Sequence, residues 1–187
     1  MFEVLARDFI RIIKQYGIRA KLERRGLRVG LRAIFSIDNL NDFQFGELVS
    51  VGHGSVVVVT NEMVADEGYR STLTVGNEVY INEYCNIRAS GGQISIGNKV
   101  LLAQFVTIIG SNHSYEKKNS IMDQKWDSRK VEVFIGNDVW IGAHTTILPG
   151  SRIMDGAIVG ANSLINGIVP AYEIWAGNPA RKVGARK

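Results

Sequence analysis

The chain of 187 residues is poor in cysteine, proline and histidine, with one, three and three of them. A single cysteine cannot form an internal disulfide, which argues against a disulfide-stapled secreted fold and favours a reducing, cytoplasmic compartment. No apolar run reaches the roughly 18 residues of a membrane-spanning helix, and the N-terminal residues lack the apolar core of a secretory signal. Hydrophobic residues make up 45% of the chain, so we expect a single folded domain over residues 1–187.

Positive charge is concentrated at the N-terminus. Residues 1–32 carry nine basic and three acidic side chains, although the whole chain has a net charge of only +4. Apolar residues recur there every three or four positions, which predicts an amphipathic helix over residues 1–20. Its apolar face is expected to pack on its own domain or on a sister subunit. A second interpretation places residues 1–32 against an anionic membrane surface, as a peripheral contact. No nucleic-acid-binding motif is present.

A repeat of six residues dominates the second half of the chain. Its branched apolar anchors are Ile135, Ile141, Ile147, Ile153, Val159 and Ile165. The small or β-branched residues four positions after each anchor are Val139, Thr145, Ser151, Ala157, Ser163 and Val169. A step of six suits neither an amphipathic helix nor a set of hairpins. It predicts an all-β solenoid, in which each hexapeptide forms one short strand and one corner.

An earlier block has the same rhythm, slips by three residues across Ser90–Gly92, and then resumes. The pattern is less clean nearer the N-terminus, so we expect a β-helix over about residues 28–170 with irregular early coils. Glycine or asparagine often follows the anchor, as Gly136, Gly142 and Gly160 do, and such residues would accept the positive φ of a tight corner.

The rhythm is lost between Ile108 and Ile135, which predicts a loop over residues 112–132 that protrudes from the solenoid. Long loops on a regular scaffold are often functional, and His113 stands at the base of this one. The arrangement fits a metal-dependent solenoid enzyme such as a γ-class carbonic anhydrase poorly. The three histidines have no metal-ligand spacing, so no metal site is expected. His53, His144 and Cys85 are interpreted as structural.

The segment IGNDVWIGAHTTILPGSRIMDGAIVGANSLI and the ending IWAGNPARKV resemble the hexapeptide-repeat acetyltransferases, close to the sugar O-acetyltransferases of the maltose, galactoside and polysaccharide-modifying kinds. The resemblance covers about residues 75–183. It implies a left-handed parallel β-helix, assembled as a homotrimer with active sites between subunits. It also implies acetyl-CoA as co-substrate, and a cofactor-binding turn and tail over residues 171–187.

Carried over to this chain, the resemblance makes His113 the general base, which would take the proton of the attacking hydroxyl. The backbone N–H of Ala143 would stabilise the oxyanion. The donor-binding residues that it implies are Trp140, Gly142, Ala143, Ala161, Asn162, Pro179, Arg181 and Lys182. The acceptor half is not transferable from the resemblance. Polar or aromatic outward positions make Asn82, Asn86 and Trp126 the candidate acceptor contacts.

The sequence therefore predicts an acetyl-CoA-dependent O-acetyltransferase that acts on a sugar hydroxyl by direct transfer, in the synthesis of a surface polysaccharide. Two alternatives stay open. The acceptor could be an amine, as in an amino sugar nucleotide, an amino acid or an antibiotic. The solenoid could also have lost catalysis and serve as a binding module.

Overall fold

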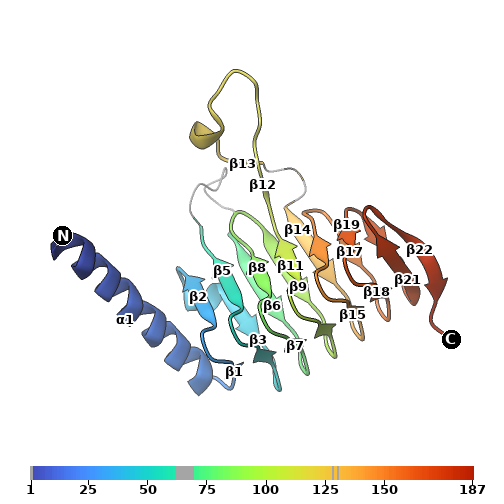
Figure 1. Ribbon diagram of the computed structural model, residues 1–187, viewed down its shortest axis with the longest axis horizontal. Coiled ribbons are helices and arrows are strands. Elements are labelled where there is room, and N and C mark those ends of the chain that lie inside the picture. Colours follow the sequence, from blue (N-terminus) through green and yellow to red (C-terminus); the bar gives the residue numbers. More distant parts are fainter. Residues whose placement is uncertain (1, 62–69, 128, 130) are drawn as a thin grey trace.

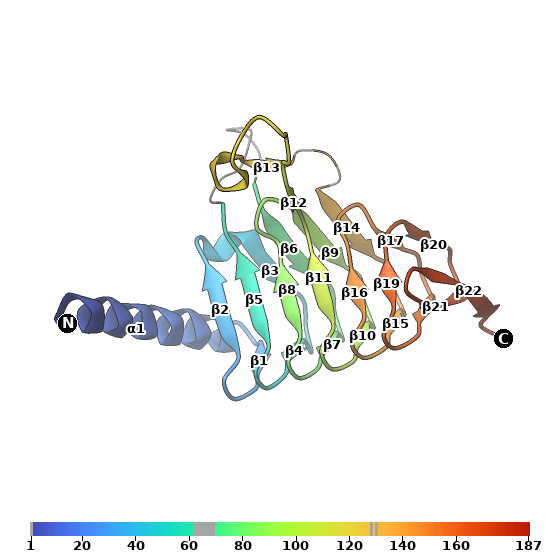
Figure 2. The ribbon, with the colours of Figure 1, turned by 45° about the horizontal axis from the view of Figure 1, so that its top comes forward.

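The computed structural model describes residues 2–61, 70–127, 129 and 131–187, and the side chains of the N-terminal helix from residue 13 onward. Helix α1 (Phe2–Arg24) projects from one end of a three-sided prism of short strands, and a loop protrudes from one edge of the prism (Figures 1 and 2). The expected architecture, a left-handed parallel β-helix with an N-terminal helix, is confirmed.

Three sheets, here called A, B and C, form the faces of the prism. Sheet A contains β1 (Arg28–Val29), β4 (Ser50–Val51), β7 (Tyr80–Ile81), β10 (Leu101–Leu102), β15 (Trp140–Ile141), β18 (Ile158–Val159), β21 (Glu173–Gly177) and β22 (Ala180–Ala185). Sheet B contains β2 (Ile34–Ile37), β5 (Val56–Val59), β8 (Asn86–Arg88), β11 (Thr107–Ile109), β16 (Thr146–Ile147) and β19 (Leu164–Ile165). Sheet C contains β3 (Phe43–Phe45), β6 (Thr72–Val75), β9 (Gln93–Ile96), β14 (Glu132–Ile135), β17 (Arg152–Ile153) and β20 (Ile168–Val169).

The chain visits sheets A, B and C in turn. The three edges of the prism are therefore called corner AB, corner BC and corner CA, after the strands that each corner connects. All neighbouring strands within sheets A, B and C are parallel except β21 and β22, which pair in antiparallel fashion.

Inward aliphatic side chains stack in register from coil to coil. In sheet A, for example, Ile81, Leu102, Ile141 and Val159 are Cα partners in consecutive strands, and all four are buried. Each such contact removes apolar surface from water, which stabilises the fold by roughly 25 cal/mol per Å² buried. Backbone hydrogen bonds between coils pair the N–H and C=O groups of the strands. The repeat of six residues is the spacing that keeps one aliphatic side chain per face inside the prism.

The early coils are more regular than their sequence indicates. Phe35 pairs in register with Val57, and Val57 with Ile87, so the first coil already joins the ladder of sheet B. The expectation of irregular early coils is therefore wrong for the strands. The connections between these strands vary in length, and this variation obscures the six-residue step in the sequence.

The glycines that follow the anchors have a different role from the one expected. Positive φ falls two residues later, at Asp138, His144 and Asn162. A Cβ on Gly142 would lie 2.5 Å from the backbone nitrogen of Ala161 in the next coil. These glycines are needed because the backbones of successive coils approach closely, and the strained corner position carries a side chain instead.

Val169 also occupies a different position from the one its spacing indicates. It pairs with Ile153 in sheet C, so it is an inward anchor and not a small residue of a corner. The connection from Ile165 to Val169 is shorter than one repeat, and Gly167 adopts a φ of 140° within it. The solenoid therefore tightens at its last corner BC.

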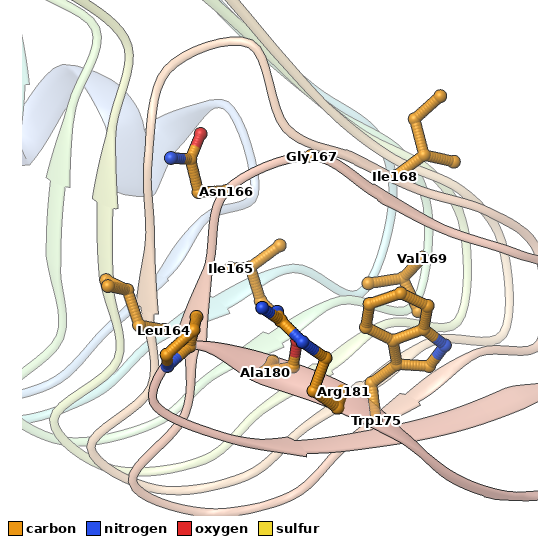
Figure 3. Close-up of a pocket in the computed structure, with 10 residues that line it drawn as sticks. Leu164, Ile165, Asn166, Gly167, Ile168, Val169, Trp175, Ala180 and Arg181 are labelled. Carbon is orange, nitrogen blue, oxygen red and sulfur yellow. The ribbon is translucent and has the colours of Figure 1, made fainter.

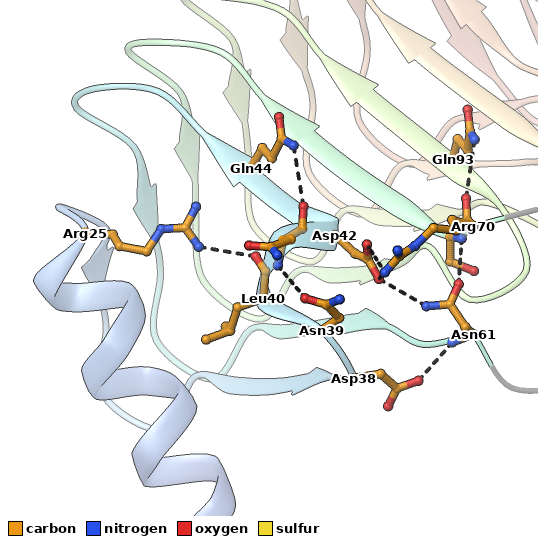
Figure 4. Close-up of polar contacts among 11 residues, drawn as sticks. Arg25, Asp38, Asn39, Leu40, Asp42, Gln44, Asn61, Arg70 and Gln93 are labelled. Atoms are coloured by element: carbon orange, nitrogen blue, oxygen red, sulfur yellow. Dashed lines mark hydrogen bonds and ion pairs between the residues drawn. The ribbon is translucent and has the colours of Figure 1, made fainter.

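Corner BC carries the longest connections of the chain. It includes the 3₁₀ turn η1 (Leu40–Asp42), the connection between β5 and β6, residues 89–92 and the protruding loop. The carboxylate of Asp42 is 5% exposed and accepts hydrogen bonds from Asn61 at 3.1 Å and Arg70 at 3.0 Å, as Figure 4 shows. This polar cluster, centred on the buried Asp42, ties residues 61 and 70 to the first coil.

Helix α1 extends to Arg24, four residues beyond the expected end at residue 20. Its C-terminal part is anchored, because Leu22 is fully buried and the guanidinium of Arg19 donates to the carbonyl oxygens of Val29 and Gly30. Ile13 and Tyr16 remain 55% and 70% exposed. No helix in the part of the chain that the structure describes is long and apolar enough to cross a membrane.

We expect the Ile108→Ala substitution to lower the free energy of unfolding by about 2–5 kcal/mol, because it leaves a cavity in a fully packed layer. Ile108 is fully buried, whereas Ile168, the matched control, is 59% exposed. The Ile168→Ala substitution should cost about 0.5 kcal/mol or less. Urea denaturation followed by circular dichroism measures both, and equal losses would contradict this description of the core.

Candidate functional site

The protruding loop begins and ends in a small two-stranded sheet. Strands β12 (Asn112–His113) and β13 (Trp126–Asp127) pair in antiparallel register, with His113 opposite Trp126. The imidazole of His113 packs on the indole of Trp126, with ring centroids 4.2 Å apart and planes inclined by 36°. His113 is nevertheless exposed to solvent. The chain thus holds an accessible imidazole on an ordered support at corner BC.

Gly91 lies against the indole of Trp126, and an ion pair follows Trp126 in the chain. Gly91 has a φ of 68°, and a Cβ there would lie 2.5 Å from Cδ1 of the indole, so only glycine leaves room for the ring. Asp127 forms a bidentate ion pair with Arg129, at 2.8 and 2.9 Å. Hydrogen bonds from Arg129 lower the pKa of the Asp127 carboxyl. The loop tip contains the 3₁₀ turn η2 (Ile121–Asp123).

The expected donor-binding residues lie along sheet A and corner AB. Trp140 points outward from β15 and is 50% exposed. Gly142 and Ala143 follow it in corner AB, and Ala161 and Asn162 occupy the same corner of the next coil. The N–H of Asn162 donates to the carbonyl of Ala143 at 2.8 Å. Among the described residues, the N–H of Ala143 meets no acceptor, so it is available to a ligand, as are the N–H groups of its corner equivalents Gln104 and Ala161.

Corner AB also carries a row of rings that the sequence did not reveal. Tyr84 stacks on Phe105 with ring centroids 5.2 Å apart, and Phe105 stacks on His144 at 4.5 Å. All three adopt φ values between 56° and 60°. They lie one coil apart in space, but insertions make their sequence spacings unequal, and this hides the relation. His144 is thus an exposed corner residue beside Ala143, as its position in the repeat indicated.

The C-terminal hairpin of β21 and β22 covers the last coil and borders a cavity of about 260 Å³, shown in Figure 3. Pro179 and Arg181 line this cavity. Lys182 instead points to Glu173, whose carboxylate also accepts from the indole N–H of Trp175 at 2.8 Å. The hydrogen bond from Lys182, followed by that from Trp175, lowers the pKa of Glu173. Of the two residues expected to contact the CoA phosphates, Lys182 is already paired with a carboxylate. Arg181 is therefore the more available of the two.

The structure divides the predicted site residues between two edges of the prism. His113 and Trp126 stand at corner BC, whereas Trp140, Gly142, Ala143, Ala161 and Asn162 stand at corner AB and the adjoining edge of sheet A. In Figures 1 and 2 the loop and the turns after β7 and β15 lie at opposite sides. One chain therefore does not bring its own imidazole to its own Ala143.

The candidate acceptor residues are divided as well. Asn82 lies in corner AB, where its amide nitrogen donates to the carbonyl of Leu102 at 2.7 Å and braces the coil. Asn86 points outward from sheet B, and its side-chain oxygen is buried without a hydrogen-bond partner in the described part of the chain. Of these three candidates, Trp126 is the one that packs on His113. Within the described ranges, no three His, Cys, Asp or Glu side chains gather as metal ligands would.

Residues 132–167 match the family described as bacterial transferase hexapeptide, six repeats. WbbJ of Escherichia coli K12, named for O-acetyl transfer in lipopolysaccharide biosynthesis, is 32% identical over 92% of this chain and 86% of its own length. Galactoside O-acetyltransferase of the same organism is 30% identical over 62% of this chain and 55% of its own length.

Solved structures share the fold. A point mutant of AntD, an N-acyltransferase from Bacillus cereus in complex with coenzyme A and dTDP-4-amino-4,6-dideoxyglucose, superposes with a TM-score of 0.67 and 21% identity, covering 90% of this chain and 89% of its own. A maltose O-acetyltransferase from Clostridium difficile 630 gives 0.53 and 23%, covering 92% and 77%.

Cys85, the one thiol of the chain, is buried and structural. It fills the inward slot of corner AB that Ser55, Thr145 and Ser163 fill in other coils, and its Sγ donates to the carbonyl of Ala103 at 3.2 Å. Burial raises the pKa of this thiol from its ordinary 9.0 to about 11. The thiolate needed of a nucleophile is thereby disfavoured at neutral pH.

We expect iodoacetamide at pH 8 to leave Cys85 unmodified in the native protein and to modify it fully in guanidinium chloride, as measured by intact mass.

Because the folded pKa is raised, the thiol's contribution to stability is complete below pH 9.0 and is lost as the pH rises toward 11. The melting temperature should fall more between these pH values than that of Cys85→Ser. Rapid native labelling would show that the thiol is accessible.

Proposed function

Because this chain belongs to the hexapeptide-repeat acetyltransferases, and is therefore an acyltransferase, we propose that it transfers the acetyl group of acetyl-CoA to a hydroxyl of a sugar destined for a surface polysaccharide. The observation that carries the proposal is the exposed imidazole of His113, held on Trp126 at the base of the loop. The likeness to WbbJ supports both the O-acetyl chemistry and the saccharide acceptor.

In the proposed reaction His113 acts as the general base. Its neutral ring nitrogen takes the proton of the acceptor hydroxyl while that oxygen attacks the thioester carbonyl. The new C–O bond forms a tetrahedral intermediate, whose oxyanion would accept a hydrogen bond from the backbone N–H of Ala143. The C–S bond then breaks, and the CoA sulfur takes up the proton from His113. Direct transfer agrees with the burial of Cys85, which leaves no thiol nucleophile at the surface.

The division of the site between two corners supports the second part of the proposal, a trimer with shared sites. The base of one chain would face corner AB of a neighbouring chain, because its own corner AB lies across a face of the prism. Exposed apolar side chains follow this edge of sheet A, including Tyr80, Leu101 and Trp140, which are 45%, 41% and 50% exposed. Cyclic assembly would place every such edge against a neighbour.

The donor would lie along corner AB and the edge of sheet A. In this arrangement the pantetheine arm passes Trp140, Gly142, Ala161 and Asn162 toward Ala143. The CoA phosphates would meet the hairpin, where Arg181 offers a guanidinium fork. Lys182 would add charge at that end while remaining paired with Glu173, and Pro179 shapes the turn.

We expect His113→Ala to lower kcat by about 100-fold or more with little change in the melting temperature, because the imidazole is exposed and acts as a base. Thiol release from acetyl-CoA, measured over a panel of sugars and amino sugars, gives the rate and the acceptor class. His53→Ala is the matched control, since the ring of His53 packs on Tyr84 in corner AB and not on Trp126. Full activity of His113→Ala would refute the mechanism, and turnover of amines alone would replace O-acetylation by N-acetylation.

Mixing two inactive variants tests whether two chains share each site. His113→Ala lacks the base, and the double variant Trp140→Ala/Arg181→Glu lacks donor binding. Random co-assembly into trimers should restore about one site in four, because each working site needs one intact half from each of two chains. No recovery from co-expressed chains that sediment as mixed trimers would place both halves of the site in one chain.

A further inference from the structure

A groove crosses the outer face of sheet B, between helix α1 and the protruding loop. It consists of two adjoining cavities of about 420 and 440 Å³ that share Lys14, Ser36, Asp38, Val58 and Arg88. The strand register explains its course. Ser36, Val58, Arg88 and Ile109 are Cα partners on β2, β5, β8 and β11, so their outward side chains form one row across the sheet.

One end of the groove reaches Trp126, the residue on which the candidate base packs. Trp126, whose ring packs on His113, lines the second cavity together with Thr60, Ser90 and Ser111. The hydroxyls of Thr60 and Ser90 are hydrogen-bonded at 2.7 Å, and that of Ser111 donates to the carbonyl of Ser90. An indole beside a cluster of hydroxyls is a surface on which a sugar ring can stack and form hydrogen bonds.

The middle of the groove carries two cations. Arg88 and Lys14 are exposed, and neither side chain forms a hydrogen bond or ion pair with any described residue. One carboxylate also lines the groove, that of Asp38, and its Oδ2 accepts the backbone N–H of Asn61 at 2.9 Å (Figure 4). The groove therefore has a net positive charge. Arg88 stands in a row whose neighbours, Val58 and Ile109, are aliphatic, so the sheet itself supplies no partner for the guanidinium.

We propose that this groove binds the acceptor, and that the acceptor is a saccharide carrying a phosphate ester. Arg88 holds the phosphate with bidentate, charge-assisted hydrogen bonds, assisted by Lys14. The sugar then lies on Trp126 with a hydroxyl at His113. Strand β8 is next to β11, about 4.8 Å away, and β11 leads into the hairpin that carries His113. Arg88 and Trp126 line the same cavity, so a sugar that stacks on Trp126 can direct its phosphate toward Arg88. This inference rests on the proposed function for the identity of the reacting hydroxyl, but not for the binding of phosphate.

Binding to the full-length protein tests the proposal without reference to turnover. The probes are galactose, galactose 1-phosphate, UDP-galactose and farnesyl-phospho-galactose, titrated calorimetrically at low and at high salt. We expect the phosphate-bearing probes to bind at least tenfold more tightly than galactose, and the advantage to shrink with salt. The tightest of the three distinguishes a free sugar phosphate, a nucleotide sugar and a lipid-linked sugar.

Variants then assign the phosphate to the groove. Arg88→Gln should weaken the phosphate-bearing probes about tenfold or more and leave galactose unchanged, whereas Arg88→Lys should lose less. Arg152→Gln is the matched control, because Arg152 lies over Phe134 on the outer face of sheet C, away from the groove. Wild-type affinities that do not distinguish galactose from its phosphates, or that are the same in Arg88→Gln, would overturn the proposal.

Acetylation measured alongside keeps the two hypotheses apart. Arg88-dependent phosphate binding without thiol release from acetyl-CoA over the acceptor panel would leave the groove in place and count against the proposed acetyl transfer. Turnover with no preference for phosphate-bearing acceptors, unchanged in Arg88→Gln, would support the transfer and eliminate the groove as the acceptor site.

Discussion

The stacking of one aliphatic side chain on the next, at a constant step of six residues and on three faces, is the interaction on which this protein depends. A step of six residues takes the chain from one face of the prism to the next, so every anchor points inward and meets its equivalent in the following coil. Ile87, Ile108 and Ile147 show this in sheet B, where they are register partners with no exposed surface. The core is thus a thin column, and the outward surface and the corners are free to vary.

The corners use that freedom in different ways. Corner BC accepts insertions of several lengths on successive coils, and its largest insertion presents His113. Corner AB keeps its length, and its strained position carries Tyr84, Phe105, His144 and Asn162 in a continuous row. Because the core beneath both corners is rigid, an imidazole on one corner and a backbone N–H on the other are held in fixed positions, and a neighbouring chain can complete each half.

Much of the fold could be predicted from the sequence, because the anchors from Ile135 onward repeat without interruption. The solenoid, the protruding loop and the N-terminal helix follow from periodicity and from its interruption, whereas the left-handed form follows from the family resemblance. The role of Gly142 could not be predicted, since its sequence position cannot distinguish a positive φ from a close approach of the next coil. The regularity of the early coils is hidden in the sequence as well, because the connections between their strands vary in length. That Phe35 and Val57 are register partners becomes visible only in the paired strands.

The candidate site was predictable in its parts but not in its arrangement. His113, Trp140 and the AGNPAR ending are local motifs. The separation of His113 from Ala143 depends on which face of the prism each anchor occupies. To assign these faces from the sequence, the loop must first be removed and the whole coils counted. Arg88 and Lys14 could not be found at all, since a single arginine on a strand and a lysine on a helix become neighbours only through the docking of α1.

The antiparallel pairing of β22 with β21 has a consequence for how the molecule behaves at high concentration. A parallel solenoid ends in a rung of unpaired backbone groups that matches the rung at its start, so open copies would tend to polymerise end to end into fibres. The final strand, whose first residue Ala180 is buried, runs in the opposite direction at the edge of sheet A. The parallel register of that face therefore cannot continue into an incoming copy, which works against end-to-end growth.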